Sequence, residues 1–232
     1  MKVLLTGTTG FVGKALYQEL SARKYHLTCA FRKPHKNLWQ TDFVNCTPCF
    51  LDHVDGDTLW SPCLQHIDQV VHLAGMAHAA GKNGSVGHSR YFSVNHEGTQ
   101  NLAVQAARQG VKRFVFLSSI MVNGKISSGR PFCETGTENP QNAYAASKLE
   151  AEKSLKKIGA DSGMEVVILR PPLVYGPHVK ANFLKLLALV YSGVPLPFGG
   201  VSKKRSFLAL ENLVDAVCLC MNHENAANQT FV

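Results

Sequence analysis

The beginning of the chain constrains its fold more than any other part. An apolar run at Lys2–Thr6 leads directly into the sequence TGTTGFVG at 6–13, in which the glycines are spaced G-x-x-G-x-x-G. The next segment, Phe11–Lys24, has apolar residues at 12, 15, 16 and 20, which is the period of an amphipathic helix. A strand that runs into a glycine-rich turn and then into a helix predicts the first unit of a dinucleotide-binding fold.

Each glycine of this turn has an expected role. Gly7 permits the tight turn, Gly10 lets the backbone approach a pyrophosphate, and Gly13 allows the helix to pack closely on the strand. The N-terminus of the helix then offers unpaired N–H groups to the phosphates. A glycine-rich turn alone is often only a turn, but its place between a strand and a helix predicts dinucleotide binding. The cofactor-binding residues predicted here are Gly7, Thr9, Gly10, Phe11, Val12 and Gly13.

Apolar runs rich in β-formers continue to alternate with helical patterns along the chain. Strands are predicted at Leu27–Phe31, Cys49–Asp52, Gln69–Ala74, Arg113–Ser118 and Glu165–Leu169, and long helices at Ser89–Gln109 and Asn142–Ile158. This alternation predicts an α/β fold, a Rossmann-type doubly wound parallel sheet, over residues 1–170.

Residues 171–232 are expected to form a small, partial substrate-binding lobe. Five prolines between 171 and 197 interrupt any regular pattern, and helices are expected near Ala181–Tyr191 and Leu210–His223. The last residues, Gln229–Val232, have the pattern of a strand that is just beginning. We therefore expect the C-terminal lobe to be truncated.

Composition and charge argue against several classes of protein. Hydrophobic residues make up 45% of the chain and charged residues 17%, as in ordinary soluble proteins. The sequence has no apolar run long enough for a membrane-spanning helix, and its N-terminus does not resemble a secretory signal, so we expect a cytoplasmic protein without a membrane partner. The net charge is +8, but no basic stripe with stacking aromatics accompanies it, so nucleic acid is not an expected partner.

The seven cysteines are scattered, and the one CxxC pair, Cys46 and Cys49, has no second pair at the spacing of a zinc site. We therefore expect no metal, and we expect reduced, partly buried thiols.

The catalytic prediction rests on Tyr144, Lys148 and Ser119. Tyr144 and Lys148 are four residues apart in NAYAASKLEAE, which places both on one face of a helix. A lysine ammonium stabilises a phenolate and lowers the pKa of tyrosine, so the pair can move a proton to or from a substrate hydroxyl while hydride moves to or from nicotinamide. Ser119 follows a predicted strand, at the edge where ligands bind in parallel sheets, and its hydroxyl can orient the same substrate oxygen.

The end of the second predicted strand bears on the choice between NAD and NADP. Sites that prefer NAD usually have an acidic residue here, whereas this chain has Arg32 and Lys33. Arg32 can pair with a 2′-phosphate, which favours NADP, or it can be a solvated side chain that stacks on adenine, which leaves NAD equally possible.

With these motifs in place, the chain resembles the extended short-chain dehydrogenase/reductases of the NAD-dependent epimerase/dehydratase family. The matching segments are TGTTGFVG at 6–13, LDHVD at 51–55, HLAGMAH at 72–78, VNHEGTQNL at 94–102, FLSSIMVNG at 116–124 and YAASK at 144–148. The resemblance implies that Asp52 and His53 contact adenine and that Asn95 makes a structural or cofactor-side bond. The other residues expected to line the cofactor are Leu73, Ala74, Gly75 and Pro171, and His78 is expected at the substrate.

The C-terminal stretches at 170–187, 195–200 and 203–216 resemble nucleotide-sugar 4-epimerases. This resemblance implies that Asn182 meets a diphosphate, that Phe198 packs on uracil and that Arg205 meets phosphate. An arginine fork and an aromatic face suit a UDP ligand physically. The chain departs from the family at three positions: it has Leu173 in place of a substrate-binding asparagine, Asn123 in place of a tyrosine and Ala145 in place of a glycine.

The leading functional hypothesis is therefore 4-epimerisation of UDP-glucose or UDP-N-acetylglucosamine with a bound NAD or NADP. The alternative is a one-way, NAD(P)H-dependent 4-keto reductase of a nucleotide-linked deoxysugar. A non-catalytic dinucleotide-binding protein is a third reading, which the Tyr144–Lys148 pair disfavours. A dehydratase is also disfavoured, because Ile120 and Met121 follow Ser119 where those enzymes carry an Asp-Glu pair.

A homodimer is also expected. The segments Ser89–Gln109 and Asn142–Ile158 carry apolar residues beyond one stripe, including Leu149 and Leu155. In the family that the chain resembles, the matching helices pair across a two-fold axis.

Overall fold

The computed structural model describes residues 1–32, 42–77, 84–127, 129–179, 181–193, 195 and 204–232, with the backbone alone at 84–87, 181 and 182. Its centre is a seven-stranded sheet with the order β3-β2-β1-β4-β5-β6-β9. All six neighbouring pairs of strands are parallel. The strands are β1 Lys2–Thr6, β2 His26–Arg32, β3 Cys46–Leu51, β4 Gln69–His72, β5 Arg113–Leu117, β6 Glu165–Leu169 and β9 Thr230–Phe231.

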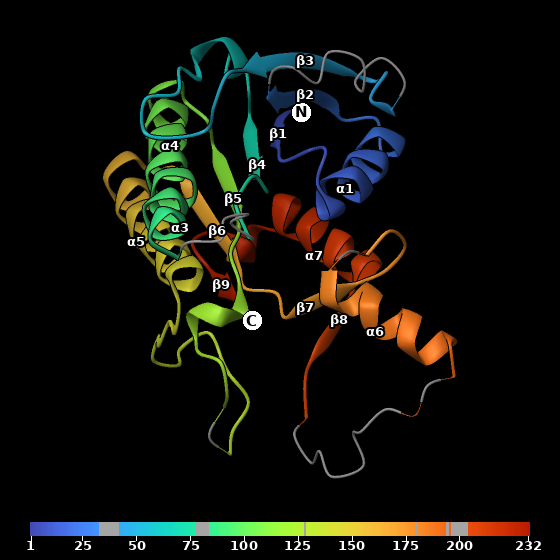
Figure 1. The fold of residues 1–232 in the computed structure, drawn as a ribbon. Coiled ribbons are helices and arrows are strands. Elements are labelled where there is room, and N and C mark those ends of the chain that lie inside the picture. Colours follow the sequence, from blue (N-terminus) through green and yellow to red (C-terminus); the bar gives the residue numbers. More distant parts are fainter. Residues whose placement is uncertain (33–41, 78–83, 128, 180, 194, 196–203) are drawn as a thin grey trace.

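Helices cover both faces of this sheet, as predicted (Figure 1). Alternate residues of one strand point to opposite faces, so Leu5 of β1 lies in the cluster under α1 and α7, whereas Leu4 lies in the cluster under α4 and α5. The helices are α1 Phe11–Ala22, α3 Gly84–Tyr91, α4 Gly98–Arg108, α5 Ala143–Ser162, α6 Ala181–Tyr191 and α7 Leu210–Asn222. Short 3₁₀ turns are η1 Ser61–Cys63, η3 Ile120–Val122 and η4 Glu224–Ala226.

The strand order reverses between β1 and β4. From β1 the chain builds outward through β2 and β3, and it then returns to build β4, β5 and β6 on the other side of β1. The two inner strands pair in register from Val3 opposite Gln69 to Thr6 opposite His72. In parallel α/β sheets, ligands bind beyond the carboxyl ends of the strands at such a reversal. The residues after β1 and β4 therefore lie where the fold accommodates a ligand.

The helix predicted at Ser89–Gln109 is not one regular helix. It consists of α3, then a π-helix η2 at Phe92–Glu97, then α4. π-Helical turns are rare and occur mostly at functional sites. The helix predicted at Asn142–Ile158 extends further, to Ser162. It starts where the Asn142 side chain accepts a hydrogen bond from the N–H of Ala145 and ends at Gly163, which has a φ of 77°.

The chain after Arg170 contributes to two places. β7 Leu173–Tyr175 pairs in parallel with β8 Phe207–Ala209 in a separate two-stranded sheet, beside which α6 lies (Figure 1). By contrast, α7 packs on the central sheet through Leu213, Val217 and Met221. β9 extends the central sheet beyond β6. Two elements of the C-terminal part therefore complete the Rossmann layers.

The expectation of reduced cysteines is wrong for one pair. Cys49 of β3 and Cys63 of η1 form a disulfide across 14 residues, with their Cα atoms 5.6 Å apart. The spacing of the cysteines in the sequence did not indicate the pair, because η1 comes close to β3 only in the folded chain. The other five cysteines are free.

Among the residues that the structure describes, His, Cys, Asp and Glu side chains form no cluster that could hold a metal, and no helix is long and apolar enough to cross a membrane.

Candidate active site

The turn between β1 and α1 is shaped by glycines that leave no room for a side chain. Gly7 has a φ of +72°, and a Cβ there would lie 2.6 Å from the backbone nitrogen of Ala74. A Cβ on Gly13 would lie 2.1 Å from the carbonyl oxygen of Gly7. The absence of a side chain at Gly13 therefore lets the helix pack closely on the turn, whereas we predicted close packing on the strand. Gly10 donates a backbone hydrogen bond to the Gly7 carbonyl at 2.9 Å and precedes α1 without a side-chain cap. This narrow backbone cradle fits a pyrophosphate at the start of α1.

A buried histidine joins β1, β4 and α4 behind this turn. His72 ends β4, and its Nδ1 lies 2.7 Å from the hydroxyl of Thr6. Its Nε2 lies 3.0 Å from the hydroxyl of Thr99, which itself donates to the carbonyl of Asn95. Since the Thr99 hydroxyl donates elsewhere, it accepts from Nε2–H, and Nδ1 is the acceptor for Thr6. Thr6 in turn accepts from the N–H of Ala74 at 3.2 Å. The relay fixes a neutral tautomer and ties the residues after β4 to β1.

The environment of His72 makes protonation unfavourable. The side chain is fully buried, and this burial, aided by the nearby Lys148 charge, lowers the pKa of His72 to about 3. Because the folded pKa is below the ordinary value of 6.5, the unfolded chain binds the extra proton between about pH 6.5 and 3. The contribution of His72 to stability is therefore present above that window and is lost as the pH falls through it.

We expect a His72→Gln variant to lose less stability on acidification than the parent protein. Between pH 7.5 and pH 5, the parent should lose about 2 kcal/mol of unfolding free energy through His72 alone. Urea unfolding at the two pH values measures this difference. His26→Gln, at the exposed start of β2, controls for the loss of a histidine. An equal pH effect in the parent and in His72→Gln would contradict the expectation.

Asn95 lies in the π-helix and holds the loop after β4. Its side-chain oxygen accepts from the N–H of Met76 at 2.7 Å, and its amide nitrogen donates to the carbonyl of Met76 and to the hydroxyl of Ser147, both at 3.0 Å. Ser147 donates in turn to the carbonyl of Tyr144. Asn95 is completely buried, and these contacts are structural; the cofactor-side bond that the resemblance also allowed stays a prediction. Its side chain links the cofactor-side loop to the start of α5.

Lys148 lies on the second turn of α5, buried against the end of β5. Its ammonium donates to the carbonyl of Leu117 at 2.9 Å and lies 4.4 Å from the ring centre of Phe116. A Cβ on Gly75 would come within 3.2 Å of the same nitrogen. Burial lowers the pKa of Lys148 to about 8, and the carboxylate of Glu152 opposes this shift.

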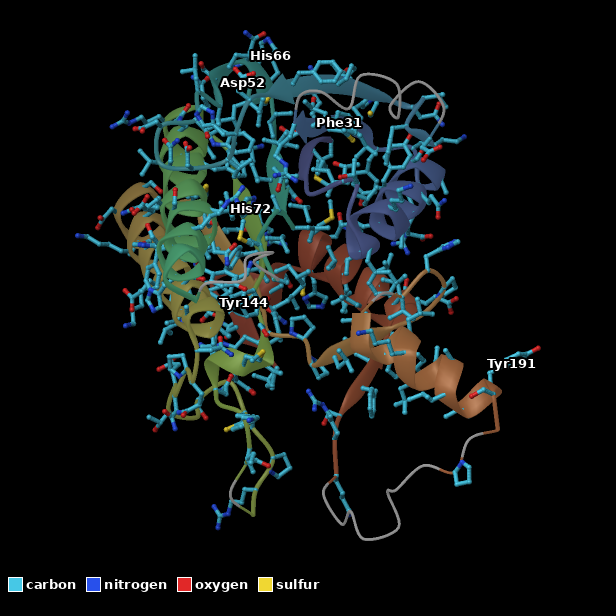
Figure 2. The ribbon with its side chains drawn as sticks, in the orientation of Figure 1. Phe31, Asp52, His66, His72, Tyr144 and Tyr191 are labelled. Atoms are coloured by element: carbon cyan, nitrogen blue, oxygen red, sulfur yellow. A yellow bond between two sulfur atoms is a disulfide. The ribbon has the colours of Figure 1, made fainter. Side chains whose placement is uncertain are left out.

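The electrostatics of Tyr144 differ from the prediction. Burial raises the pKa of Tyr144, and the Ser119 hydroxyl opposes this shift, whereas Lys148 is not among the groups that affect it. The Lys148 ammonium donates to the carbonyl of Leu117. The Tyr144 ring packs edge-on against Tyr91 with centroids 6.0 Å apart. The Ser119 side chain, two residues after the end of β5, is buried and accepts from the N–H of Met121. Ser119 thus interacts with Tyr144, and the Lys148 ammonium lies at the end of β5, two residues before Ser119. Figure 2 shows Tyr144 near the middle of the molecule.

The residues predicted at the adenine lie at neighbouring strand ends. Arg32 ends β2 with an exposed side chain, and it pairs in register with Leu51 at the end of β3. Asp52 and His53 follow β3 and are exposed. The sheet therefore brings Arg32, Asp52 and His53 together, although 20 residues separate Arg32 from Asp52 in the sequence.

The predicted substrate residues are described only in part. His78 and Phe198 lie outside the described residues, and for Asn182 the structure gives the backbone position in α6 alone. Arg205 has an exposed side chain two residues before β8. Pro171, predicted at the cofactor, accepts a hydrogen bond from the N–H of Ile120 at 3.0 Å, which joins the chain after β6 to the chain after Ser119.

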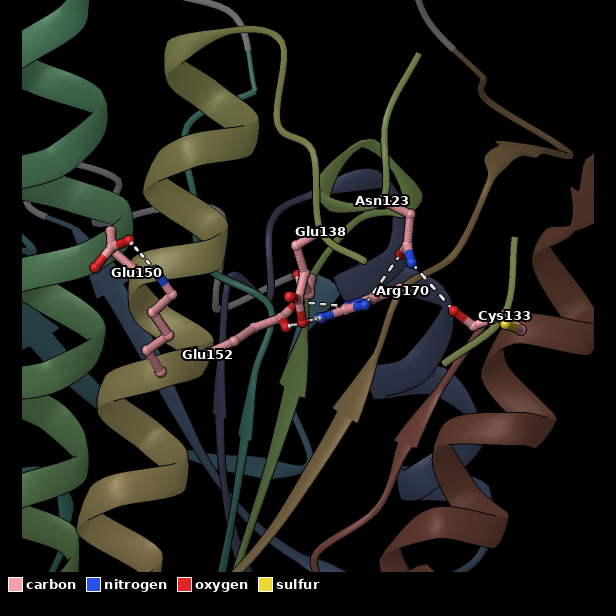
Figure 3. Close-up of polar contacts among 8 residues, drawn as sticks. Asn123, Cys133, Glu138, Glu150, Glu152 and Arg170 are labelled. Carbon is pink, nitrogen blue, oxygen red and sulfur yellow. Dashed lines mark hydrogen bonds and ion pairs between the residues drawn. The ribbon is translucent and has the colours of Figure 1, made fainter. Parts of the chain in front are cut away.

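Sequence reasoning missed a buried ion pair beside the catalytic residues. Arg170, directly after β6, binds Glu152 of α5, and both side chains are completely buried (Figure 3). One signal was present, since Glu152 follows Lys148 by four residues and so lies on the same face of α5. Asn123, noted as a departure from the family pattern, accepts from the same guanidinium.

Comparisons with known proteins agree with this architecture. A UDP-glucose 4-epimerase from Vibrio cholerae is 41% identical over 237 residues, which cover 99% of this chain and 69% of that protein. The structure of MoeE5 in complex with UDP-glucose and NAD superposes with a TM-score of 0.79 at 26% identity, over 99% of this chain and 75% of that one. A UDP-glucuronic acid 4-epimerase from Bacillus cereus, in complex with UDP-glucuronic acid and NAD, gives a TM-score of 0.82 at 25% identity, over 99% of this chain and 76% of that one.

The family comparison covers nearly the whole sequence. The model of the NAD dependent epimerase/dehydratase family matches residues 3–232, a span that includes the glycine turn, the Tyr144–Lys148 pair and the two-stranded sheet after Arg170. Together with the fold and the assembled site, this match confirms the resemblance inferred from the sequence: the chain belongs to the NAD dependent epimerase/dehydratase family.

Proposed function

We propose that this protein is a nucleotide-sugar 4-epimerase that acts on a UDP-hexose with NAD as a retained cofactor. The observation that carries the proposal is the 41% identity, over 99% of this chain, to a UDP-glucose 4-epimerase. The structural neighbours named above, with UDP-sugars and NAD bound, support the same substrate class and cofactor.

The residues of the site fit a bound NAD. The turn at Gly7 and Gly13 is packed so closely that neither position has room for a Cβ atom, and such a tight glycine turn lets its backbone approach a pyrophosphate. Gly75 is also closely packed, because a Cβ there would lie 3.2 Å from the ammonium nitrogen of Lys148. When bound, NAD supplies the hydride acceptor for carbon 4 of the sugar and then the hydride donor for its return.

The residues of this chain then supply proton transfer and orientation. Tyr144 accepts the proton of the 4-hydroxyl as the 4-keto sugar forms, and it returns that proton when the sugar is reduced on its other face. Burial raises the pKa of the half-buried Tyr144 phenol, so the phenol holds its proton at neutral pH. To accept a proton it must first become a phenolate, a form that positive charge near the ring would favour. The Ser119 hydroxyl orients the same sugar oxygen, a role supported by its interaction with Tyr144.

Interconversion of UDP-glucose and UDP-galactose tests this proposal directly. With NAD added, proton NMR should show each sugar nucleotide converting to the same final mixture, without accumulation of reduced nicotinamide. UDP-N-acetylglucosamine and UDP-glucuronic acid, assayed in parallel, identify the preferred hexose. Repeating the assay with NADP tests the alternative raised by Arg32. Stoichiometric consumption of a reduced cofactor would instead support the 4-keto reductase, and binding of NAD without conversion of any UDP-hexose would overturn the proposal.

Two further expectations stay predictions. One is a homodimer. The apolar residues that suggested it, Leu149 and Leu155, are buried within the single chain, so these two side chains are not available to a partner. The other is a cytoplasmic location.

A further inference from the structure

The completely buried guanidinium of Arg170 binds three side chains at one end of the sheet. Arg170 donates from Nε to both carboxylate oxygens of Glu152 at 3.1 Å, and from one terminal nitrogen to Glu152 Oε2 at 2.6 Å. The same terminal nitrogen donates to Glu138 at 3.1 Å, and the other donates to the side-chain oxygen of Asn123 at 3.1 Å. Figure 3 shows Arg170 enclosed by these acceptors. The hydroxyl of Ser118 also donates to Glu152 Oε1.

These contacts enclose the segment that carries Ser119. The N–H of Ser118 donates to the carbonyl of Leu169 at 2.7 Å, and the N–H of Ile120 donates to the carbonyl of Pro171 at 3.0 Å. Both neighbours of Ser119 are thus fastened to the chain on either side of Arg170.

Glu152 fixes the helix to the same point. It lies one helical turn after Lys148 and two turns after Tyr144 on α5. The Glu152–Arg170 pair therefore sets the distance between the Ser119 segment and the face of α5 that carries the other two catalytic residues.

Stability alone does not account for such a pair. Removing two charges from water costs several kcal/mol for each ion, and replacing a buried pair by apolar residues of similar size is often neutral or stabilising. The pair nevertheless lies directly behind the proposed active site. Its position indicates a role in geometry, as expected for the supporting residues of a preorganised site.

A second ion pair, between the starts of β5 and β6, provides an internal comparison. Arg113 starts β5 and binds Glu165, which starts β6, at 2.6 Å. Arg113 is also buried and also donates to two backbone carbonyls, those of Cys220 and His223. Because the strands are parallel, this pair lies at the opposite end of the sheet from Arg170.

We propose that Glu152 and Arg170 are positioning residues, which hold Ser119 against the Tyr144–Lys148 face of α5 and so set the turnover number without touching substrate. The proposal rests on the proposed function for its kinetic consequence. The charge of Glu152 also supports the ammonium of Lys148, by opposing the effect of burial. Among the described residues, Lys148 also interacts with His72, which is neutral.

The kinetic test compares two double variants. In Glu152→Gln/Arg170→Met, we expect kcat to fall between about tenfold and a hundredfold, because a displacement of about 1 Å in a reacting group has effects of that size. KM for the sugar nucleotide should stay within about twofold, because no substrate contact is removed. The control, Arg113→Met/Glu165→Gln, should keep its kcat within about twofold. Equal falls in kcat in both variants, or an unchanged kcat in the first, would overturn the proposal. Thermal melting shows that each variant is folded.

The single variant Glu152→Gln provides a test that keeps the shape of the side chain. Its amide oxygen still accepts from Ser118 or Arg170, and Glu138 remains to balance the charge of Arg170, so thermal melting should show a folded protein. Without the carboxylate, the pKa of Lys148 should fall, so the alkaline limb of the kcat profile should move to lower pH. An unmoved limb would count against the role of Glu152.

A measurement without substrate separates this inference from the proposed function. The ionisation of Tyr144 is followed by ultraviolet absorbance as the pH rises. The absorbance change of the same protein carrying Tyr144→Phe is subtracted, so that only the contribution of Tyr144 remains. In Glu152→Gln/Arg170→Met, the pKa of Tyr144 should rise, because the Ser119 hydroxyl that opposes the rise is displaced. If no sugar nucleotide is converted, the proposed function fails, yet this titration still decides the positioning role. An identical titration in parent and variant overturns the role.

Discussion

Replacing Tyr144 by phenylalanine should lower turnover by about a hundredfold to ten-thousandfold while leaving NAD binding nearly unchanged. The substitution removes only the hydroxyl that moves the proton. The ring is kept, and so is its edge-on packing against Tyr91 at 6.0 Å. The backbone carbonyl that accepts from Ser147 is also unaffected. The loss should therefore appear in kcat, with KM and cofactor affinity changing little.

Steady-state kinetics with the preferred UDP-hexose, together with a fluorescence titration of NAD, measures both quantities. Tyr25→Phe is the matched control, because its hydroxyl bonds Asn222 on the surface and belongs to no part of the site. Turnover of Tyr144→Phe close to that of the parent would remove Tyr144 from the mechanism. A large loss of NAD affinity in the variant would assign Tyr144 to binding instead.

Replacing Gly7 by alanine should reduce NAD affinity by at least about a hundredfold, equivalent to about 2.7 kcal/mol. The new Cβ would lie 2.6 Å from Ala74 N, 2.7 Å from Leu73 C and 2.9 Å from Leu73 O, so backbone must move. That movement displaces the carboxyl ends of β1 and β4 together, because Ala74 also donates to Thr6. The pyrophosphate cradle and the loop lining the cofactor would both be distorted.

Gly110 separates this steric effect from backbone strain. Its φ is +76°, close to the +72° of Gly7, but a Cβ there would meet nothing within 4 Å. Gly110→Ala should therefore lose only the strain of a left-handed residue, about 1–2 kcal/mol of stability, and keep its NAD affinity. Calorimetric titration of NAD and thermal melting of both variants measure the difference. If the two variants behaved alike, the close approach at Gly7 would be irrelevant to the cofactor.

The parts of the fold that could be predicted are those encoded by local patterns. The run Lys2–Thr6 was predicted as a strand and is β1, and the glycine turn leads into α1 as expected. The strand predicted at Glu165–Leu169 is β6 with the same bounds. The alternation of strand and helix patterns also predicted a parallel sheet covered on both faces. This was possible because the spacing of apolar residues within each element indicates whether it is a strand or a helix and which face is buried.

Local patterns were less informative where packing decides the conformation. The predicted helix Ser89–Gln109 contains the π-helix around Asn95, whose buried amide bonds Met76 and Ser147. Helical periodicity cannot indicate this irregular turn, because its stabilising partners lie far away in the sequence. Likewise, sequence patterns did not indicate the disulfide between Cys49 of β3 and Cys63 of η1, because only the folded chain brings these two elements together.

For the proposed active site, sequence motifs indicated which residues to propose as catalytic, whereas the contacts of each residue follow from the packed fold. The spacing of Tyr144 and Lys148 placed them on one helical face, because helix geometry is local. It did not reveal that the Lys148 ammonium binds the carbonyl of Leu117, 31 residues earlier. Nor did it pair Glu152 with Arg170 across 18 residues. Such contacts depend on how the ends of β5, β6 and α5 meet, and only the packed sheet fixes those distances.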